Sequence, residues 1–310
     1  MLHHAWILTG ATATGKSSVC QFIAERMNLK ILSADSMMVY KGMDIGTAKP
    51  SAAERGNVPY FGIDMVTPDR TFSTGAWLRE IKTELRYTET SPEKPLIVTG
   101  GTGLYIKALV SGIESEASDP EVRRQGETIL DEGGIEALRS EIRKSLPDCP
   151  PSLIVGNNPR RLIRTLEQIR TSGSVPDNWK NNEDPVIITL GMERKQLYAR
   201  ILRRVETMFR QGLLDEVRNL RKLYPAWSDT ARKAIGYEEA LAVLDGVITQ
   251  DEAVERISQR TRRLAKRQET WFRHQHKTVR HNIDDGDCIE ITAEKVLNLW
   301  QKYGSIKINI

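Results

Sequence analysis

Eight residues near the amino terminus have the types and spacing needed to bind phosphate. Residues 10–17 read GATATGKS and fit the pattern G-x-x-x-x-G-K-[ST]. In such a loop, backbone N–H groups cradle phosphate oxygens, a lysine supplies positive charge and a hydroxyl can ligate Mg²⁺. The residues that we expect to hold the phosphates are Gly10, Ala11, Thr12, Ala13, Thr14, Gly15, Lys16 and Ser17. A glycine-rich turn without this function is the alternative, but an apolar strand pattern precedes the loop and a helical pattern follows it.

A phosphate-binding loop does not define the reaction. ATP or GTP hydrolysis and kinase chemistry need a second apolar strand that ends in an acid to hold the metal. The candidate strand Pro95–Thr99 continues as Gly-Gly-Thr-Gly and carries no carboxylate. The usual nucleotide-triphosphatase interpretation is therefore weakened.

Two other residues are placed for chemistry at strand ends. Asp35 follows the apolar stretch Leu29–Leu32 and could act as a general base or as a metal ligand through water, or simply as a helix cap. Thr102 follows Gly100 and Gly101, where its backbone and hydroxyl can approach a phosphate, although a tight turn would use the same residues. Ligands of open α/β sheets bind at the carboxyl ends of the strands, so these residues should lie near Ser17.

Basic residues are concentrated late in the chain. The formal net charge is only +4, but residues 256–280 hold nine Lys or Arg against one acid, a local balance of +8. Aromatic and histidine rings at Trp271, Phe272, His274 and His276 accompany them, which is typical of phosphate tracking with base stacking. A solvated charged face is the alternative. Arg160, Arg161, Arg164 and Arg170 form a second cluster, and the two together could hold a bulky polyanion.

The elements that must position these residues have the pattern of an α/β fold. Short apolar runs alternate with helical patterns, which indicates a parallel sheet covered by helices. The predicted strands are Ala5–Thr9, Lys30–Ser33, Gly62–Val66, Pro95–Thr99, Pro185–Leu190 and Thr278–Ile283. Helical patterns fill most of 193–275, where an apolar stripe through Val254, Ile257, Thr261, Leu264, Gln268 and Trp271 predicts the buried face of the last long helix. A final helix is predicted over Ala293–Lys302.

The block between the fourth and fifth strands has the pattern of an insertion. It begins with an Asp119-Pro120 helix start, breaks at Gly133-Gly134 and contains a second helix after Asn158-Pro159. A polar return linker is predicted over 172–184. We therefore divide the chain into a catalytic core, residues 1–117 and 184–310, and an inserted helical domain, residues 118–183.

Composition limits the class of protein. With 310 residues, 39% of them hydrophobic, the chain is long enough for two globular units. Its three cysteines have no CxxC spacing, which argues against a disulfide framework and favours a reducing cytoplasm. No apolar run approaches the roughly 20 residues of a membrane helix, and no signal-peptide core precedes the first strand.

Several longer motifs resemble one family. They are Gly10–Ser17, Ser33–Ser36 leading into Val39–Pro50, Gly100–Tyr105, Asn158–Arg161, and Ala265–Gln268 followed by Thr270–Arg273. Together they resemble the bacterial-type tRNA dimethylallyltransferases, also called tRNA isopentenyltransferases, from the first strand to about Arg273. The resemblance implies a P-loop NTPase-like sheet core with an inserted all-α tRNA-binding domain.

The activity that the resemblance implies is transfer of a dimethylallyl group from dimethylallyl diphosphate to N6 of the adenosine at tRNA position 37, with release of diphosphate. By similarity, Asp35 would accept the N6 proton, and Ser17, Lys16, Thr102 and Arg232 would stabilise the diphosphate with Mg²⁺. The residues that would contact tRNA are Asp35, Ser36, Met37, Met38, Thr102, Arg123, Pro159, Arg160, Arg161, Leu162, Ile163, Arg273 and Lys277. A cytoplasmic monomer would suffice for this reaction.

Two departures and two alternatives remain. Some relatives carry an arginine directly after the tyrosine of the segment 231–237, where this chain has Glu238, so phosphate contact there depends on Arg232 and Lys233, unless these pair with nearby acids. The zinc-finger extension of eukaryotic relatives is missing from this sequence. A small-molecule kinase of the P-loop class is the second hypothesis, and an RNA-binding module with a vestigial phosphate site is the third.

Overall fold

The protein is described by a computed structural model covering residues 2–112, 119–173, 185–284 and 286–310. Its chain divides into two compact units, Met1–Val110 with Glu183–Ile310, and Ser111–Asn182. The return linker predicted over 172–184 falls almost entirely outside the described residues. No helix among the described residues is long and apolar enough to cross a membrane.

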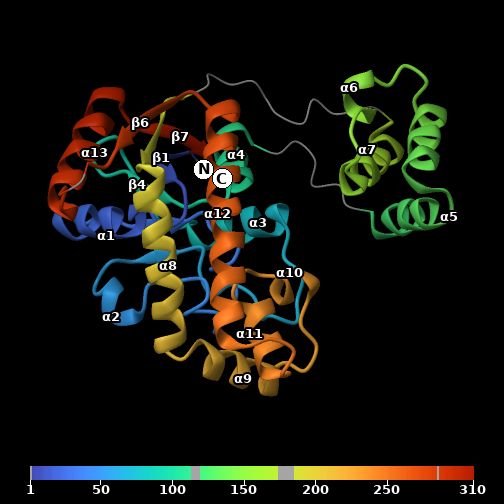
Figure 1. The fold of residues 1–310 in the computed structure, drawn as a ribbon. Coiled ribbons are helices and arrows are strands. Elements are labelled where there is room, and N and C mark those ends of the chain that lie inside the picture. The colour runs from blue at the N-terminus through green and yellow to red at the C-terminus, as the bar shows by residue number, and fades with distance from the viewer. Residues whose placement is uncertain (1, 113–118, 174–184, 285) are drawn as a thin grey trace. The chain divides into compact units, whose positions relative to one another are not determined.

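The first unit is built on one sheet with the order β3-β2-β4-β1-β5-β6. Figure 1 shows the ribbon of this sheet and its helices. These strands pair in parallel, and a further strand, β7, pairs antiparallel with the first half of β1. The strands are β1 (Leu2–Gly10), β2 (Ile31–Ser33), β3 (Tyr60–Phe61), β4 (Leu96–Thr99), β5 (Ile187–Gly191), β6 (Thr278–Asn282) and β7 (Ile306–Asn309). The predicted parallel sheet is confirmed.

Helices cover both faces of the sheet, so its central strands are apolar on both sides. The helices of this unit are α1 (Lys16–Met27), α2 (Ala52–Arg55), α3 (Thr74–Glu84), α4 (Gly103–Ser111), α8 (Arg194–Arg210), α9 (Leu213–Leu223), α10 (Asp229–Arg232), α11 (Tyr237–Leu244), α12 (Gln250–Gln275) and α13 (Ile289–Tyr303). In β1, Ala5 and Ile7 join a core formed with α3, α4, α9 and α11. Trp6 and Leu8 join the core formed with α1, α8 and α13.

Two strand predictions need correction. The strand expected over Gly62–Val66 lies earlier, at Tyr60–Phe61, because Gly62 (φ +75°) and Asp64 (φ +54°) turn the chain away from the strand direction. β7 has no counterpart among the predicted strands, since its four residues become a strand only by pairing with Leu2–Ala5.

The second unit is helical. It contains α5 (Pro120–Ser145), α6 (Pro151–Ile154) and α7 (Pro159–Ser172), around a core to which Leu138, Ile142 and Leu166 contribute. Asp119 caps α5 and Asn158 caps α7, as their Asp-Pro and Asn-Pro pairs predict. The predicted break at Gly133-Gly134 appears as a kink in α5, where Gly134 has φ +67°.

Candidate functional site

The phosphate-binding loop joins the end of β1 to the start of α1 in the first unit. Ala13 (φ +66°) and Gly15 (φ +91°) adopt left-handed backbone conformations inside it. Such turns direct successive N–H groups inward, which forms an anion-binding concavity. The Thr14 hydroxyl donates to the carbonyl of Ala11 at 2.8 Å, and this carbonyl also accepts from Lys16 Nζ at 3.2 Å. The loop is therefore closed on itself, with the lysine lying across it.

Lys16 is strongly affected by its surroundings. Its side chain is only 9% exposed, and this burial lowers the pKa of Lys16 to about 8. The Asp35 carboxylate acts in the opposite direction, while the positive charge of Arg204 lowers the pKa of Lys16 further. A buried cation that is short of negative partners is well suited to an anionic ligand.

Asp35 and Thr102 meet at the carboxyl ends of β2 and β4. The Thr102 Oγ1 accepts from the backbone N–H of Ser36 at 2.9 Å, and the Thr102 N–H donates to the Ala34 carbonyl at 3.2 Å. Gly100 allows this approach, because a Cβ there would overlap the Ala34 backbone. Asp35 Oδ1 accepts from the N–H of Met37 at 2.9 Å. The segment from Asp35 to Met38 is half-buried.

Gln268 of α12 joins the phosphate loop to the glycine-rich loop after β4. Its Oε1 accepts from the Thr12 N–H at 2.8 Å, and its Nε2 donates to the Gly101 carbonyl at 3.0 Å. One turn later, the Trp271 ring lies directly against the Cα of Gly103. The predicted apolar stripe is thus wrong at these two positions: Gln268 makes polar contacts and Trp271 is 36% exposed, whereas Phe272 is buried.

Arg204 of α8 belongs to the site, although the residues predicted from the sequence do not include it. Its Nη1 donates to Thr12 Oγ1 and its Nη2 to the Thr47 carbonyl, each at 3.2 Å. Burial lowers the pKa of Arg204, and the Asp35 carboxylate opposes that shift. Arg200, one turn earlier, lies near Gly15, because a Cβ there would be 3.7 Å from the Arg200 guanidinium. The i,i+4 spacing of these arginines was a signal, but charged helix faces commonly have it.

Arg232, which the resemblance assigns to the diphosphate, pairs with an acid of its own helix. It is exposed at the end of α10, and its recorded partner is Asp229 at 3.9 Å. The neighbouring Lys233 also pairs with Asp229, at 2.9 Å. Within the described residues, the structure records no contact between Arg232 and the phosphate loop. Arg204, by contrast, contacts the phosphate loop through Thr12, and the assignment of Arg232 to the diphosphate stays a prediction.

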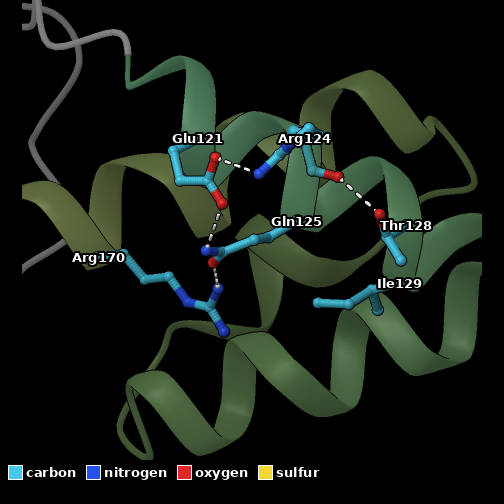
Figure 2. A pocket seen from close by; sticks show the side chains of 6 residues that line it. All are labelled: Glu121, Arg124, Gln125, Thr128, Ile129 and Arg170. Atoms are coloured by element: carbon cyan, nitrogen blue, oxygen red, sulfur yellow. Dashed lines mark hydrogen bonds and ion pairs between the residues drawn. The ribbon is translucent and has the colours of Figure 1, made fainter.

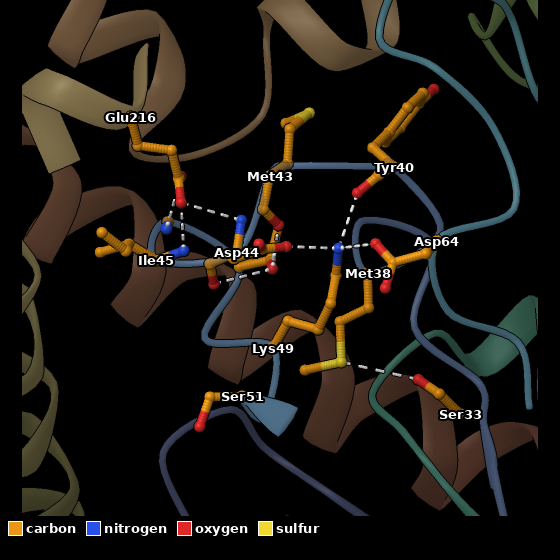
Figure 3. A network of polar contacts seen from close by, with 12 residues as sticks. Ser33, Met38, Tyr40, Met43, Asp44, Ile45, Lys49, Ser51, Asp64 and Glu216 are labelled. Carbon is orange, nitrogen blue, oxygen red and sulfur yellow. Dashed lines mark hydrogen bonds and ion pairs between the residues drawn. The ribbon is translucent and has the colours of Figure 1, made fainter. Parts of the chain in front are cut away.

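The segment 40–50 folds beside α9 as a polar network (Figure 3). Lys49 Nζ donates to the Tyr40 carbonyl at 2.7 Å and pairs with Asp44 at 2.7 Å and Asp64 at 2.6 Å. The Glu216 carboxylate accepts backbone hydrogen bonds from the same segment. These contacts fix the backbone that carries the Thr47 carbonyl.

Several basic residues of the window 256–280 form ion pairs with acids. Arg260 pairs with Glu238 and Glu239 of α11, so Glu238 neutralises an arginine of the basic window. Arg280 of β6 pairs with Glu269 at 3.3 Å. Exposed side chains in this window include Arg256, Arg263, Lys266, Arg267, Arg273 and Lys277. The excess of +8 therefore overstates the unneutralised charge, because acids outside the window take part.

In the second unit, a buried carboxylate organises the arginines. Glu167 is fully buried and pairs with Arg164 at 2.8 Å and Arg123 at 3.3 Å, and it accepts from the Asp119 N–H at 2.9 Å. Pro159 is half-buried, and Arg160 and Arg161 are exposed at the start of α7. The side chains of Leu162 and Ile163 are buried in the core of this unit. Of the expected RNA contacts on α7, the two arginines have the most accessible side chains.

A surface hollow of about 470 Å³ lies on the same unit (Figure 2). It is lined by Glu121, Arg124, Gln125, Thr128, Ile129 and Arg170. Arg124 pairs with Glu121 at 2.6 Å, and Arg170 bonds to Gln125 at 2.8 Å. Arg170 also pairs with Glu141 at 2.6 Å. Because both arginines are neutralised by neighbours, the hollow has no free positive charge for an anion.

The donors at the phosphate loop suit Mg²⁺ held mainly by its ligand and by water. Ser17 and Asp35 offer hard oxygen atoms, which Mg²⁺ prefers, and it commonly takes only one or two protein ligands beside substrate phosphates. Among the described residues there is no group of three or more His, Cys, Asp or Glu that could hold a metal ion.

Comparison with known proteins agrees with this geometry. Curated relatives named tRNA dimethylallyltransferase include one from Bacillus subtilis, 38% identical over 94% of this chain and 94% of its own. Another, from Pelotomaculum thermopropionicum, is 36% identical over 93% of this chain and 94% of its own. A third, from Bacillus velezensis, is 40% identical over 86% of this chain and 87% of its own.

Solved structures show the same fold. The full-length tRNA isopentenylpyrophosphate transferase of Bacillus halodurans is 33% identical and matches with a TM-score of 0.63, over 97% of this chain and 98% of that one. A eukaryotic dimethylallyltransferase acting on tRNA, 23% identical, matches with a TM-score of 0.71 over 96% of this chain and 76% of that one. The sequence model of the family described as IPP transferase matches residues 38–275. The chain therefore belongs to the IPP transferase family.

Proposed function

We propose that this protein transfers a dimethylallyl group from dimethylallyl diphosphate to N6 of the adenosine at tRNA position 37. The names of its relatives support this activity, and one observation of the site carries it. A phosphate-binding loop and Asp35 lie at one edge of the sheet, while β4, beside β1, ends in Thr and Gly instead of an acid. This arrangement suits a diphosphate that leaves intact, with a carboxylate available to take a proton.

The bond changes follow from this arrangement. N6 of adenosine attacks C1 of the dimethylallyl group, the C1–O bond to diphosphate breaks, and the N6 proton passes to Asp35. The leaving diphosphate gains negative charge as the bond breaks. Lys16 and Arg204, with the N–H groups of residues 10–17, would stabilise that charge, and Thr102 would add a hydroxyl at the end of β4. Ser17 would hold an Mg²⁺ ion that enters with the diphosphate, and its charge would add further neutralisation.

We assign tRNA binding to basic residues in both units. In the second unit these are Arg123, Arg160 and Arg161, and in the first they are Arg273 and Lys277. Adenosine 37 must leave the anticodon stack to be alkylated, and the segment Asp35–Met38 would line its path. Phosphate contacts of this kind make affinity fall with salt.

We place the protein in the cytoplasm and expect it to act as a monomer. Cys20 and Cys149 are buried and free, and Cys288 is exposed and free, which suits a reducing compartment. The substrate, tRNA, supports the same location.

The experiment that tests this function is mass spectrometry of tRNA after incubation with the protein, Mg²⁺ and dimethylallyl diphosphate. A gain of one C5H8 unit on adenosine is expected. No mass gain on any tRNA, together with phosphorylation of a small molecule from ATP, would favour the kinase hypothesis instead. Measurement of diphosphate release in the same reaction identifies the leaving group.

A further inference from the structure

The segment Val39–Pro50 carries the most distinctive motif of the sequence, yet the proposed reaction uses none of its side chains. Within it, residues 44–49 form a compact turn. The Ala48 N–H donates to the Ile45 carbonyl at 3.0 Å, and the Lys49 N–H donates to the Asp44 carbonyl at 2.9 Å. Ala48 has φ +50°, a left-handed conformation that is unfavourable for alanine. Such a turn persists only where its surroundings hold it.

Glu216 of α9 holds one side of this turn (Figure 3). Its Oε2 accepts from the Ile45 N–H at 2.8 Å and from the Asp44 N–H at 3.1 Å. The Tyr237 hydroxyl donates to Glu216 Oε1 at 2.6 Å, and the Tyr237 ring lies against Gly46. Hydrogen bonds to a carboxylate are stronger than those between neutral groups. Glu216 therefore fixes the turn to a helix about 170 residues further along the chain.

The other side of the turn is held by Lys49. Its ammonium is almost inaccessible and contacts Tyr40, Asp44 and Asp64, as described above. Asp44 is thus held from both sides: its carboxylate pairs with Lys49, and its N–H donates a hydrogen bond to Glu216. The backbone between them has little freedom to move.

The turn presents the Thr47 carbonyl to Arg204. Arg204 donates one hydrogen bond to this carbonyl and another to the Thr12 hydroxyl in the phosphate loop. A guanidinium has a rigid, planar set of donors, so fixing one nitrogen restricts where the others can point. We infer that Glu216 is a positioning residue: through the turn at 44–49 it holds the Thr47 carbonyl, and this carbonyl orients Arg204 toward the diphosphate.

This inference rests on the proposed function and deepens it. An arginine side chain loses considerable conformational freedom when it is ordered, and ordering it before the ligand arrives improves affinity. At metal sites, groups that orient a ligand from behind contribute on the order of 10- to 100-fold. We expect an effect of the same order from Glu216 on diphosphate binding.

The test is a double-mutant cycle read out by diphosphate binding. The affinity for magnesium diphosphate is measured by calorimetry, up to millimolar ligand, for the full chain and for Glu216→Ala, Arg204→Ala and the double variant. If Glu216 acts through Arg204, Glu216→Ala weakens binding by roughly 10-fold or more in the parent and has no further effect in the Arg204→Ala background. An equal loss in both backgrounds, or none in either, overturns the inference.

Two further variants make the result unambiguous. Arg221→Ala removes a surface ion pair with Asp245 from the same helix and should leave binding unchanged. Tyr237→Phe removes only the hydroxyl donor to Glu216 and keeps the ring against Gly46. If Glu216→Ala does not fold, Tyr237→Phe takes its place in the cycle, with a smaller loss expected and the same criterion. Failure of the parent protein to bind magnesium diphosphate would instead contradict the proposed function.

Discussion

The backbone N–H of Thr12 donates a hydrogen bond to Gln268 Oε1 at 2.8 Å, although the two residues are 256 positions apart in the chain. The other end of the same amide donates to the Gly101 carbonyl, so one side chain spans both loops at the edge of the sheet. Helix α12 thereby determines how far apart the phosphate loop and the loop after β4 can lie.

Replacing Gln268 should loosen this connection. In Gln268→Ala the Thr12 N–H and the Gly101 carbonyl lose their partner, and unmatched groups at a partly buried site cost about 1–3 kcal/mol. We expect kcat/KM for dimethylallyl diphosphate to fall by about 10-fold or more, by the same reasoning. Steady-state kinetics at saturating tRNA measure this. Gln259→Ala, on an exposed position of the same helix, is the control.

Arg204 and Arg232 give opposite expectations. Arg204→Ala removes a cation beside the phosphate loop and should reduce donor kcat/KM by about 100-fold or more, as loss of one charge-stabilising group typically does. Arg232→Ala removes an exposed partner of Asp229 and should change kcat/KM by less than about 2-fold. The reverse order of effects, measured under the same conditions, would support the assignment of Arg232 to the diphosphate that the resemblance implies.

Asp35→Asn separates proton transfer from binding. The amide oxygen can still accept from the Met37 N–H, so the local backbone should be retained. We expect kcat to fall by about 100-fold or more because an amide is a poor base. Binding of magnesium diphosphate should be retained or tighter, since a negative charge near Lys16 and Arg204 is lost. Retained turnover would exclude Asp35 as the base.

Lys16 should give the reaction an alkaline limb. Burial lowers the pKa of Lys16 to about 8, so in the free enzyme this ammonium loses its proton as the pH rises through about 8. Donor kcat/KM, which reports the free enzyme, should fall above that pH. Lys16→Arg should move the fall to higher pH, because arginine stays charged. A profile that is the same in both proteins would assign the limb to another group.

The same shift has a thermodynamic consequence. Between pH 8 and the ordinary value of 10.5, Lys16 binds more protons in the unfolded chain than in the folded one. The contribution of this group to the free energy of unfolding therefore rises with pH in that window. Urea titrations of the parent and of Lys16→Met at several pH values measure it, and the difference in slope between them should have this sign.

In the second unit, Arg160→Ala should weaken tRNA binding without affecting the donor. Arg160 is exposed at the start of α7, and loss of one phosphate contact lowers the slope of log K against log salt by about 1. The apparent KM for tRNA should rise by a few-fold, and the donor KM should not change. Arg218→Ala is the matched control. Arg218 is an exposed arginine on α9 of the first unit, where it pairs with Asp215 of the same helix.

We expect Glu167 to stabilise the fold of the second unit. Removing this fully buried carboxylate leaves the Asp119 N–H and the partly exposed Arg123 and Arg164 without their acceptor, which typically costs about 1–3 kcal/mol. Glu167→Ala should therefore lower the unfolding midpoint of the second unit. Circular dichroism measures this, and an unchanged midpoint would show that solvent compensates both arginines.

The sequence alone determined the type of sheet, the phosphate-binding loop and the helical insertion. These features are local: an apolar run of four to six residues, eight residues of fixed spacing, and Asp-Pro or Asn-Pro helix starts each carry their own signal. Asp35 and Thr102 could also be selected, because both follow strands directly and parallel strands bring their carboxyl ends to one edge.

The tertiary structure decided which distant groups reach that edge. Arg204 was one arginine among many until α8 packed beside the phosphate loop, and Gln268 has the spacing of a core residue until its amide meets two backbone groups. Likewise, Glu238 neutralises Arg260 only because α11 lies against α12. Hydrogen bonds and ion pairs act over a few ångströms, so chain spacing cannot indicate partners that folding brings together from 22 to 256 positions away.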